Sequence, residues 1–233
     1  MSCEHDGHRK RLKARFVKSG LDDFEPHNVL ELLLFYSVPR KDTNPLAHRL
    51  ISHFGSLSGV FDAKPEDLMK VEGITENTAV LISMLPQIAR RYLEDKAEAV
   101  NVISGFSDIG DYLLPKFIGR TVETVMLASL DNKNKIVSCN IIAEGETDKA
   151  NLSKRRVMEE AIKVGATRVV LAHNHPRGFA MPSTEDIHLT EEIYSLLHSV
   201  GIELVDHIIL AEDDFVSLAA SGIDFRKNNL KFL

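Results

Sequence analysis

The segment that most restricts the fold starts as an apolar strand, passes through a loop and ends in the first turn of a helix. Residues 168–172 read RVVLA, and they lead directly into HNHPRGFAMPSTED, from His173 to Asp186. The proline and the glycine that follow the second histidine interrupt regular structure, and the Pro-Ser pair at 182–183 is typical of a helix start. A domain that contains this segment has both strands and helices, with the loop at the end of a strand.

The first part of the chain is predicted to be helical. The expected helices cover residues 28–36, 45–54, 65–71 and 76–94. Gly73 lies in the turn between the last two, which predicts a helix-hairpin-helix-like unit. The basic run from His8 to Lys18, with six lysine or arginine residues and no acidic residue, predicts a separate helix. We expect a helical domain over residues 1–96, with the polar stretch 94–98 as a linker.

From about residue 101 the pattern changes to one that includes strands. The expected elements are, in chain order, strands over 121–130 and 136–143, a helix over 153–164, a strand over 168–172, a helix over 183–199, and strands over 203–210 and 215–218. Residues 131–135 form the turn between the first two strands, and Gly165 ends the first helix. Strands with helices between and after them predict an α+β domain with three layers, which we place at 101–225.

Composition and charge exclude several classes of protein. No apolar run approaches the roughly 20 residues of a membrane span, and the charged N-terminus lacks the apolar centre of a signal peptide. We therefore expect a cytoplasmic protein with no membrane partner. The two cysteines, Cys3 and Cys139, lie too far apart in the sequence to form a disulfide framework or a paired-thiolate metal site. The net charge of −6 argues against a basic nucleic-acid binder as a whole.

The loop after the apolar strand has the ligands of a metal site. His173 and His175 are two residues apart at the end of a strand, so their side chains point to the same side. Both imidazoles can then reach one ion, and Asp186, in the first turn of the next helix, is directed back at the loop. Two histidines and one carboxylate leave the fourth tetrahedral position open, which is the pattern of a catalytic zinc site.

Simpler interpretations of the same residues exist. Ser183 and Asp186 have the spacing of a capping box, in which both side chains bind backbone amides at the start of a helix. A histidine pair in a loop is also compatible with ordinary hydrogen bonding. The combination of both features, with a strand before and a helix after, favours the metal site, and Ser183 is compatible with both roles.

These residues resemble the signature of the JAMM (MPN-plus) metalloproteins, in which H-x-H-P is followed by S-x-x-D. The fuller pattern AHNHPRG, PSTED and VDHIIL is similar to the RadC-like family within that group. The resemblance covers nearly the whole chain. It implies a JAB/MPN-type mixed β-sheet domain with flanking helices, and one Zn²⁺ ion with His173, His175 and Asp186 as its ligands.

The resemblance also implies an activity. Members of known activity are peptidases or isopeptidases, so the implied partner is a peptide or protein substrate, cut in an extended chain or at an isopeptide bond. Glu123 matches the catalytic glutamate, which takes a proton from the zinc-activated water and returns it to the leaving amine. Ser183 matches the serine that helps to hold the oxyanion. The residues alone would make Glu123 a solvent-facing strand residue.

Other positions are assigned supporting roles or depart from the family pattern. Asn174 is expected to support the site through its amide. His207 is interpreted as a core histidine, with a contact to a metal ligand as the alternative. The chain departs from the family pattern at Arg177, where serine is usual, and at 154–156, which reads KRR where P-R-E is usual. These departures affect what binds at the cleft and leave the metal ligands unchanged.

A second function is binding to DNA in repair or recombination. The hairpin at 71–75 and the basic helix at 8–18 are the candidate contacts of the N-terminal domain with phosphates. Thr75 replaces the usual second glycine of such a hairpin, and Glu72 adds a negative charge. The alternatives are a hairpin that packs against the rest of the protein and a charged, solvated helix face. A third function, a non-enzymatic scaffold, does not require an open zinc site.

Overall fold

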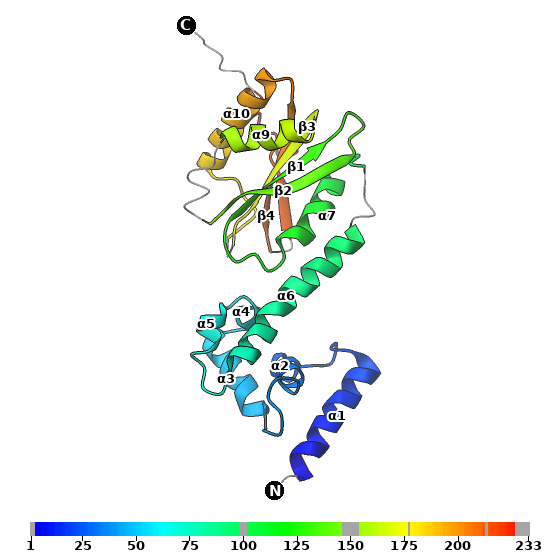
Figure 1. Ribbon diagram of the computed structural model, residues 1–233, viewed down its shortest axis with the longest axis vertical. Helices are drawn as coiled ribbons and strands as arrows, with labels where there is room; N and C mark the ends of the chain where they lie inside the picture. The colour runs from blue at the N-terminus through cyan, green and yellow to red at the C-terminus, as the bar shows by residue number, and fades with distance from the viewer. Residues whose placement is uncertain (1–2, 98–101, 146–153, 177, 213, 227–233) are drawn as a thin grey trace. The chain divides into compact units, whose positions relative to one another are not determined.

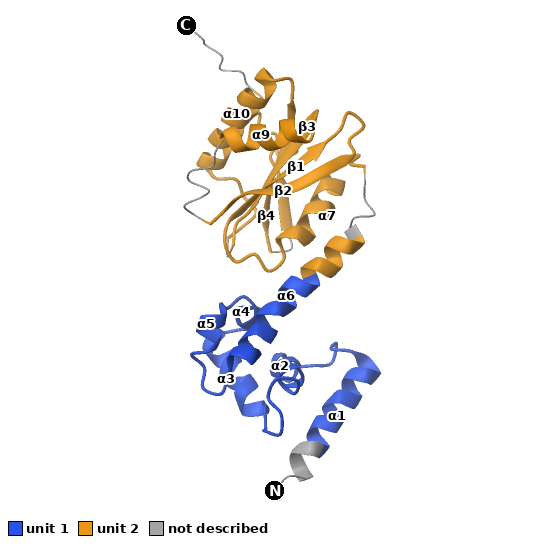
Figure 2. Cartoon of the chain, viewed as in Figure 1, with its two compact units in different colours: residues 1–89 blue, residues 90–233 orange. Residues whose placement is uncertain are grey.

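The computed structural model describes residues 3–97, 102–145, 154–176, 178–212 and 214–226. The chain forms two compact units, residues 1–89 and 90–233 (Figure 2). The division falls inside a helix that continues to Ala97, and the expected domain limits of 1–96 and 101–225 stay predictions.

The first unit is helical, as the sequence predicts. Its helices are α1 (Cys3–Ser19), α2 (Pro26–Leu34), α3 (Asn44–Phe54), α4 (Leu57–Phe61), α5 (Pro65–Leu68) and the first part of α6 (Glu76–Ala97). A proline occupies the first turn of α2, α3 and α5, where its missing amide hydrogen costs no intrahelical bond. Leucine, valine and isoleucine side chains of α2 to α6 form the core of this unit. Gly73 has φ 97° in the turn between α5 and α6, a conformation that favours glycine.

The second unit contains a mixed five-stranded sheet with the order β2-β1-β3-β4-β5. The strands are β1 (Thr124–Leu130), β2 (Ile136–Glu144), β3 (Arg168–Asn174), β4 (Glu203–Ala211) and β5 (Asp214–Ser217), and the helices are α7 (Phe106–Phe117), α9 (Lys154–Lys163) and α10 (Thr184–Ser199). Strands β3 and β4 are parallel, and the other neighbouring pairs are antiparallel. The predicted α+β class is therefore confirmed.

Helices cover both faces of the sheet (Figure 1). Helices α9 and α10 pack on one face and α7 packs on the other. In β1, Val125 and Leu127 face α9 and α10, whereas Met126 and Ala128 face α7. Strand β3 lies in the centre of the sheet, and its residues from Val169 onward are buried. This burial on both faces explains why the strand is a continuous apolar run.

Several elements differ from the expectations. Helix α5 ends at Leu68, three residues before its expected limit, and α6 continues to Ala97, through most of the stretch expected to be a linker. Strand β1 begins at Thr124, three residues later than predicted. The short helix α4 and the longer α7 were not expected. Gly110 and Pro115 weaken the helical pattern of α7, but its apolar side chains, including Leu113, pack against the sheet and stabilise the helix. None of the described helices combines the length and apolar character that a bilayer span requires.

Candidate metal centre

The two histidines lie at the end of the central strand. His173 is opposite Val125 of β1 and Ile209 of β4. The backbone amide of His175, just beyond the strand, donates to the carbonyl of Leu210 at 2.7 Å. This bond keeps the backbone extended past the end of β3, so that the two imidazoles lie on the same side, as their spacing predicts.

Asp186 is positioned by the start of α10. Ser183 is the N-cap, and its hydroxyl oxygen accepts a hydrogen bond from the Asp186 amide at 3.1 Å. The Oδ2 atom of Asp186 accepts from the amide and the hydroxyl of Ser183, at 2.9 and 2.6 Å. The capping box is therefore present, and it holds the carboxylate at the end of the helix that faces the histidines.

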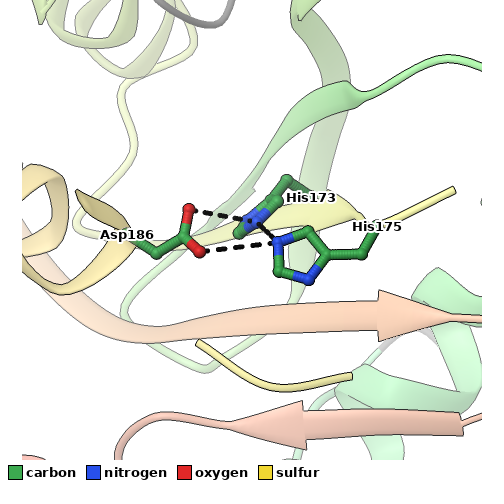
Figure 3. Close-up of side chains that lie close together, drawn as sticks. All are labelled: His173, His175 and Asp186. Carbon is green, nitrogen blue, oxygen red and sulfur yellow. Dashed lines mark hydrogen bonds and ion pairs between the residues drawn. The ribbon is translucent and has the colours of Figure 1, made fainter. Parts of the chain in front are cut away.

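The three side chains converge (Figure 3). The Nε2 atoms of His173 and His175 are 2.9 Å apart, and they lie 3.2 Å from Oδ1 and 3.4 Å from Oδ2 of Asp186, respectively. One ligand atom from each residue lies within 4.8 Å of the others. Burial by itself would raise the pKa of the Asp186 carboxyl, but the close approach of the His173 and His175 rings, together with the hydrogen bond from the Ser183 hydroxyl, holds that pKa well below its usual range.

The chemistry of these atoms fits a metal ion. The Nδ1 atom of His175 lies 3.0 Å from the carbonyl oxygen of Phe179, which can only accept a hydrogen bond. Neutral His175 therefore carries its hydrogen on Nδ1, and the lone pair of Nε2 points at His173 and Asp186. Nitrogen and oxygen lone pairs at this separation repel one another unless a cation lies between them. Two imidazole nitrogens and a carboxylate are ligands that suit zinc.

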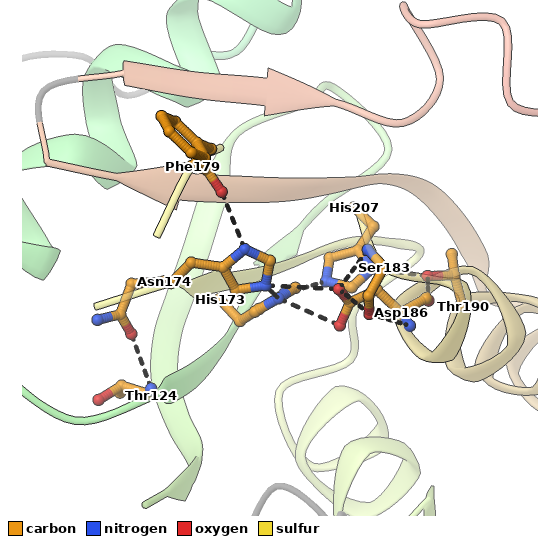
Figure 4. A network of polar contacts seen from close by, with 9 residues as sticks. Thr124, His173, Asn174, Phe179, Ser183, Asp186, Thr190 and His207 are labelled. Atoms are coloured by element: carbon orange, nitrogen blue, oxygen red, sulfur yellow. Dashed lines mark hydrogen bonds and ion pairs between the residues drawn. The ribbon is translucent and has the colours of Figure 1, made fainter. Parts of the chain in front are cut away.

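A second group of buried polar residues, His207 and Thr190, lies beside the candidate ligands (Figure 4). The Nδ1 atom of His173 lies 2.8 Å from Nε2 of His207, whose Nδ1 lies 2.6 Å from the hydroxyl of Thr190. That hydroxyl donates to the backbone carbonyl of Asp186 at 2.5 Å. The interpretation of His207 as only a core histidine is therefore wrong, because it contacts a candidate ligand. Thr190 was missed, although its spacing of four from Asp186 places both on one helix face.

Asn174, between the two histidines, holds the neighbouring segment. Its side-chain oxygen accepts from the Thr124 amide at 2.7 Å, and its amide nitrogen donates to the carbonyls of Arg120 and Val122, both at 3.2 Å. The side chain of Asn174 therefore fixes the backbone on both sides of Glu123, which is the support expected of it.

Glu123 lies directly before β1 and is half-buried. Its carbonyl accepts a hydrogen bond from the amide of Gly145 at 2.7 Å. Alternate residues of a strand face the same side of the sheet. Val125 and Leu127 face α9 and α10, and Glu123 is two residues before Val125. Its side chain is therefore expected on this face, where Asp186 lies. The β1–β3 register, continued in the same way, places Glu123 beside His175. Its catalytic role stays a prediction.

The departures from the family pattern lie in two places. Arg177 is outside the described residues. Lys154, Arg155 and Arg156 form the first turn of α9, where Lys154 pairs with Glu192 of α10 at 2.8 Å. These basic side chains are exposed and are not within the converging cluster.

Comparison with known proteins supports the architecture. Residues 103–223 match the model of a family described as the RadC-like JAB domain. A UPF0758 protein of Fusobacterium nucleatum is 30% identical, over 94% of this chain and 98% of the relative. UPF0758 proteins of Carboxydothermus hydrogenoformans and Ruegeria pomeroyi are each 34% identical, over 91% and 92% of this chain and 94% and 96% of the relatives. The names of these relatives state no activity.

Proposed function

The chain belongs to the RadC-like JAB-domain family, and from this premise we propose that it is a zinc-dependent metallopeptidase or isopeptidase-like hydrolase. The observation that supports the proposal most strongly is the convergence of His173, His175 and Asp186 on one position. The substrate would be a peptide or a protein, cut in an extended chain or at an isopeptide bond.

The three converging side chains would hold the zinc ion. Two histidines and one carboxylate are a typical set of protein ligands for a catalytic site, which keeps one position open. When bound, the ion supplies Lewis-acid chemistry that activates water near neutral pH and polarises a carbonyl group. The side chain of His175 is 17% exposed, against 1% for His173 and Asp186, so the substrate would approach from the side of His175.

The residues around the ligands would transfer protons and donate hydrogen bonds to the substrate. Glu123 would act as the general base toward the attacking water and as the general acid toward the leaving amine. Asn174 supports this role because it fixes the backbone before and after Glu123. Ser183 would donate to the oxyanion, and to do so its hydroxyl has to give up its 2.6 Å bond to Asp186, because a hydroxyl has one proton.

The metal site is tested by zinc stoichiometry. We expect close to one zinc ion per chain after zinc is offered and the excess removed, and loss of this zinc in a His173→Ala/His175→Ala variant. His188→Ala is the control, because His188 is an exposed histidine of α10 outside the cluster. If the unchanged protein and the double variant retain equal amounts of zinc, the cluster is not the site.

The hydrolytic role is tested with a library of peptides and isopeptides. Glu123→Gln should keep its zinc and lose hydrolysis by about 10²–10⁴-fold, the usual contribution of a general acid-base residue. Glu185→Gln, an exposed carboxylate on α10, should retain activity. Full activity of Glu123→Gln would remove Glu123 from the mechanism, and zinc binding without hydrolysis of any substrate would leave a metal protein that is not a peptidase.

A further inference from the structure

The buried group beside the candidate ligands has a defined direction of hydrogen bonding. Thr190 lies 2.5 Å from the carbonyl oxygen of Asp186 and 2.6 Å from Nδ1 of His207, measured from its hydroxyl oxygen. A carbonyl oxygen only accepts, and a hydroxyl has one proton, so this proton goes to Asp186. The Thr190 oxygen must then accept from His207, which places the hydrogen of neutral His207 on Nδ1.

The same argument continues to the candidate ligand. A neutral imidazole has one N–H group, so Nε2 of His207 is an acceptor. It lies 2.8 Å from Nδ1 of His173, which must therefore donate. The hydrogen of His173 is then on Nδ1, and its Nε2 carries a lone pair. That atom lies 2.9 Å from Nε2 of His175 and 3.2 Å from Oδ1 of Asp186.

We propose that His207 and Thr190 are positioning residues that fix the tautomer of His173 and direct the lone pair of its Nε2 atom at the metal position. The inference rests on the proposed metal site and is independent of the proposed peptidase activity. The chain of bonds starts at a ligand on β3 and ends at the backbone of a ligand on α10. It thereby couples the two elements that carry the ligands.

Burial protects the hydrogen bonds between these residues from competition with water. His173, Thr190 and His207 are each at most 1% exposed, so bulk water does not compete for their hydrogen bonds. A hydrogen bond to the second nitrogen of a ligating histidine fixes its ring and its tautomer, and loss of such a partner typically weakens metal binding by about 10–100-fold.

Two pairs of variants distinguish the effect of hydrogen-bond direction from the effect of side-chain volume. Thr190→Val keeps the shape of the side chain and removes the acceptor for His207, whereas Thr190→Ser keeps the hydroxyl. His207→Leu removes both hydrogen bonds. His207→Gln can accept from His173 with its amide oxygen and donate to Thr190 with its amide nitrogen, so it preserves the direction.

The first measurement is the tautomer in the metal-free protein, read from imidazole ¹⁵N shifts and two-bond ¹H–¹⁵N correlations. We expect hydrogen on Nδ1 of both His173 and His207 in the unchanged protein and in Thr190→Ser, and a mixture of tautomers in Thr190→Val. A His173 that carries its hydrogen on Nε2 in the unchanged protein would overturn the proposal.

The second measurement is zinc affinity, by competition with a chelator, with the thermal unfolding midpoint of the metal-free proteins as the check on folding. Thr190→Val and His207→Leu should bind zinc about 10–100-fold more weakly, and Thr190→Ser and His207→Gln should stay close to the unchanged protein. Equal affinity in Thr190→Val and Thr190→Ser would refute the positioning role, even if His207→Leu fails to fold. Absence of zinc binding in the unchanged protein would instead refute the proposed metal site, while the tautomers remain measurable.

Discussion

At the scale of single residues, Asp186 combines two roles that its sequence context presents as alternatives. Its Oδ2 atom accepts from the amide and hydroxyl of Ser183, as a capping residue does. Its carboxylate oxygens also lie 3.2 and 3.4 Å from the nitrogens of the two histidines. Oδ2 has two lone pairs for the two bonds from Ser183, and Oδ1 can ligate a metal ion together with the histidine nitrogens, so the two roles are compatible. The helix cap therefore positions the candidate ligand and does not compete with it.

Phe179 contacts a candidate ligand through its backbone and exposes its ring to solvent. Its backbone carbonyl accepts from His175, whereas its ring is 84% exposed, in the loop that follows the site. If the proposed hydrolase binds its substrate with this ring, we expect Phe179→Ala to bind zinc normally and to cleave substrates with about 10–150-fold lower kcat/KM. Burial of such a side chain in a complex is worth about 1.5–3 kcal/mol, and 1.4 kcal/mol corresponds to a factor of ten.

Zinc titration and steady-state kinetics of the same protein check the Phe179 prediction. Met181→Ala, which changes another exposed apolar residue of this loop, shows whether any effect belongs to the ring or to the loop in general. Weaker zinc binding by Phe179→Ala would mean that the ring, and not only the carbonyl, orders the loop.

At the scale of elements, an irregularity in β4 brings His207 to the site. The register pairs Val169 with Leu204 and Val170 with Asp206, so it skips Val205. Leu204 faces α9 and α10, and in a regular strand the even-numbered residues would follow it. The bulge shifts this alternation by one residue, so that Ile209 and His207 lie on that face instead.

The contact between α7 and β5 requires a glycine. A Cβ atom built on Gly110 would lie 2.1 Å from the ring of Phe215. Alanine is favoured over glycine in a helix by about 1 kcal/mol, but overpacking typically costs about 1–3 kcal/mol. We therefore expect Gly110→Ala to lower the free energy of unfolding, measured by chemical denaturation.

A double-mutant cycle tests this explanation, because the effect of Gly110→Ala on the free energy of unfolding should change sign. In a Phe215→Ala background the clash is absent, so Gly110→Ala should stabilise α7 by up to about 1 kcal/mol. Asp111→Ala, at an exposed position of the same helix, is the control for general effects on α7. Destabilisation of equal size in both backgrounds would show that Phe215 is not the cause.

At the scale of the whole molecule, charge is distributed unevenly over a chain with a net charge of −6. Neighbouring basic residues of α1 differ in their surroundings. The Arg9 guanidinium donates to the carbonyls of Phe35, Val38 and Lys41, at 3.2, 2.7 and 2.7 Å, and lies over the Phe35 ring. Lys10 and Arg11 are exposed. Arg9 therefore stabilises the helical unit, whereas exposed basic residues such as Lys10 and Arg11 are available to phosphates.

This division changes how contact with DNA through α1 is tested. We expect Arg9→Ala to lower the unfolding midpoint of the helical unit, because it leaves backbone carbonyls without their donor. Lys10→Ala/Arg11→Ala should leave the midpoint unchanged and, if α1 contacts DNA, reduce both the affinity and its salt dependence. Thermal unfolding and fluorescence anisotropy at several salt concentrations measure the two effects. DNA binding that is the same in the double variant would exclude these two residues as the contact.

The local pattern of the sequence determined much of the candidate site and of the fold. Spacings of two in an extended segment and of three at a helix start place His173, His175 and Asp186 by geometry that involves only neighbouring residues. The apolar run of β3 and the capped start of α10 follow from the same short-range rules. Residue spacing therefore sufficed for the α+β class and for the three candidate ligands, whereas the role of Glu123 rests on the family resemblance and stays a prediction.

Only the tertiary structure decided which distant residues meet these ligands. His207 reaches His173 because a bulge in β4 changes the face of one strand, and this bulge is defined by the pairing of β4 with β3. Helix α7 forms despite its glycine and proline because packing against the sheet outweighs a weak helical propensity. The start of β1 at Thr124 depends on the side chain of Asn174, fifty positions away in the chain. Each of these features depends on contacts between residues far apart in the sequence, which exist only once the sheet is assembled.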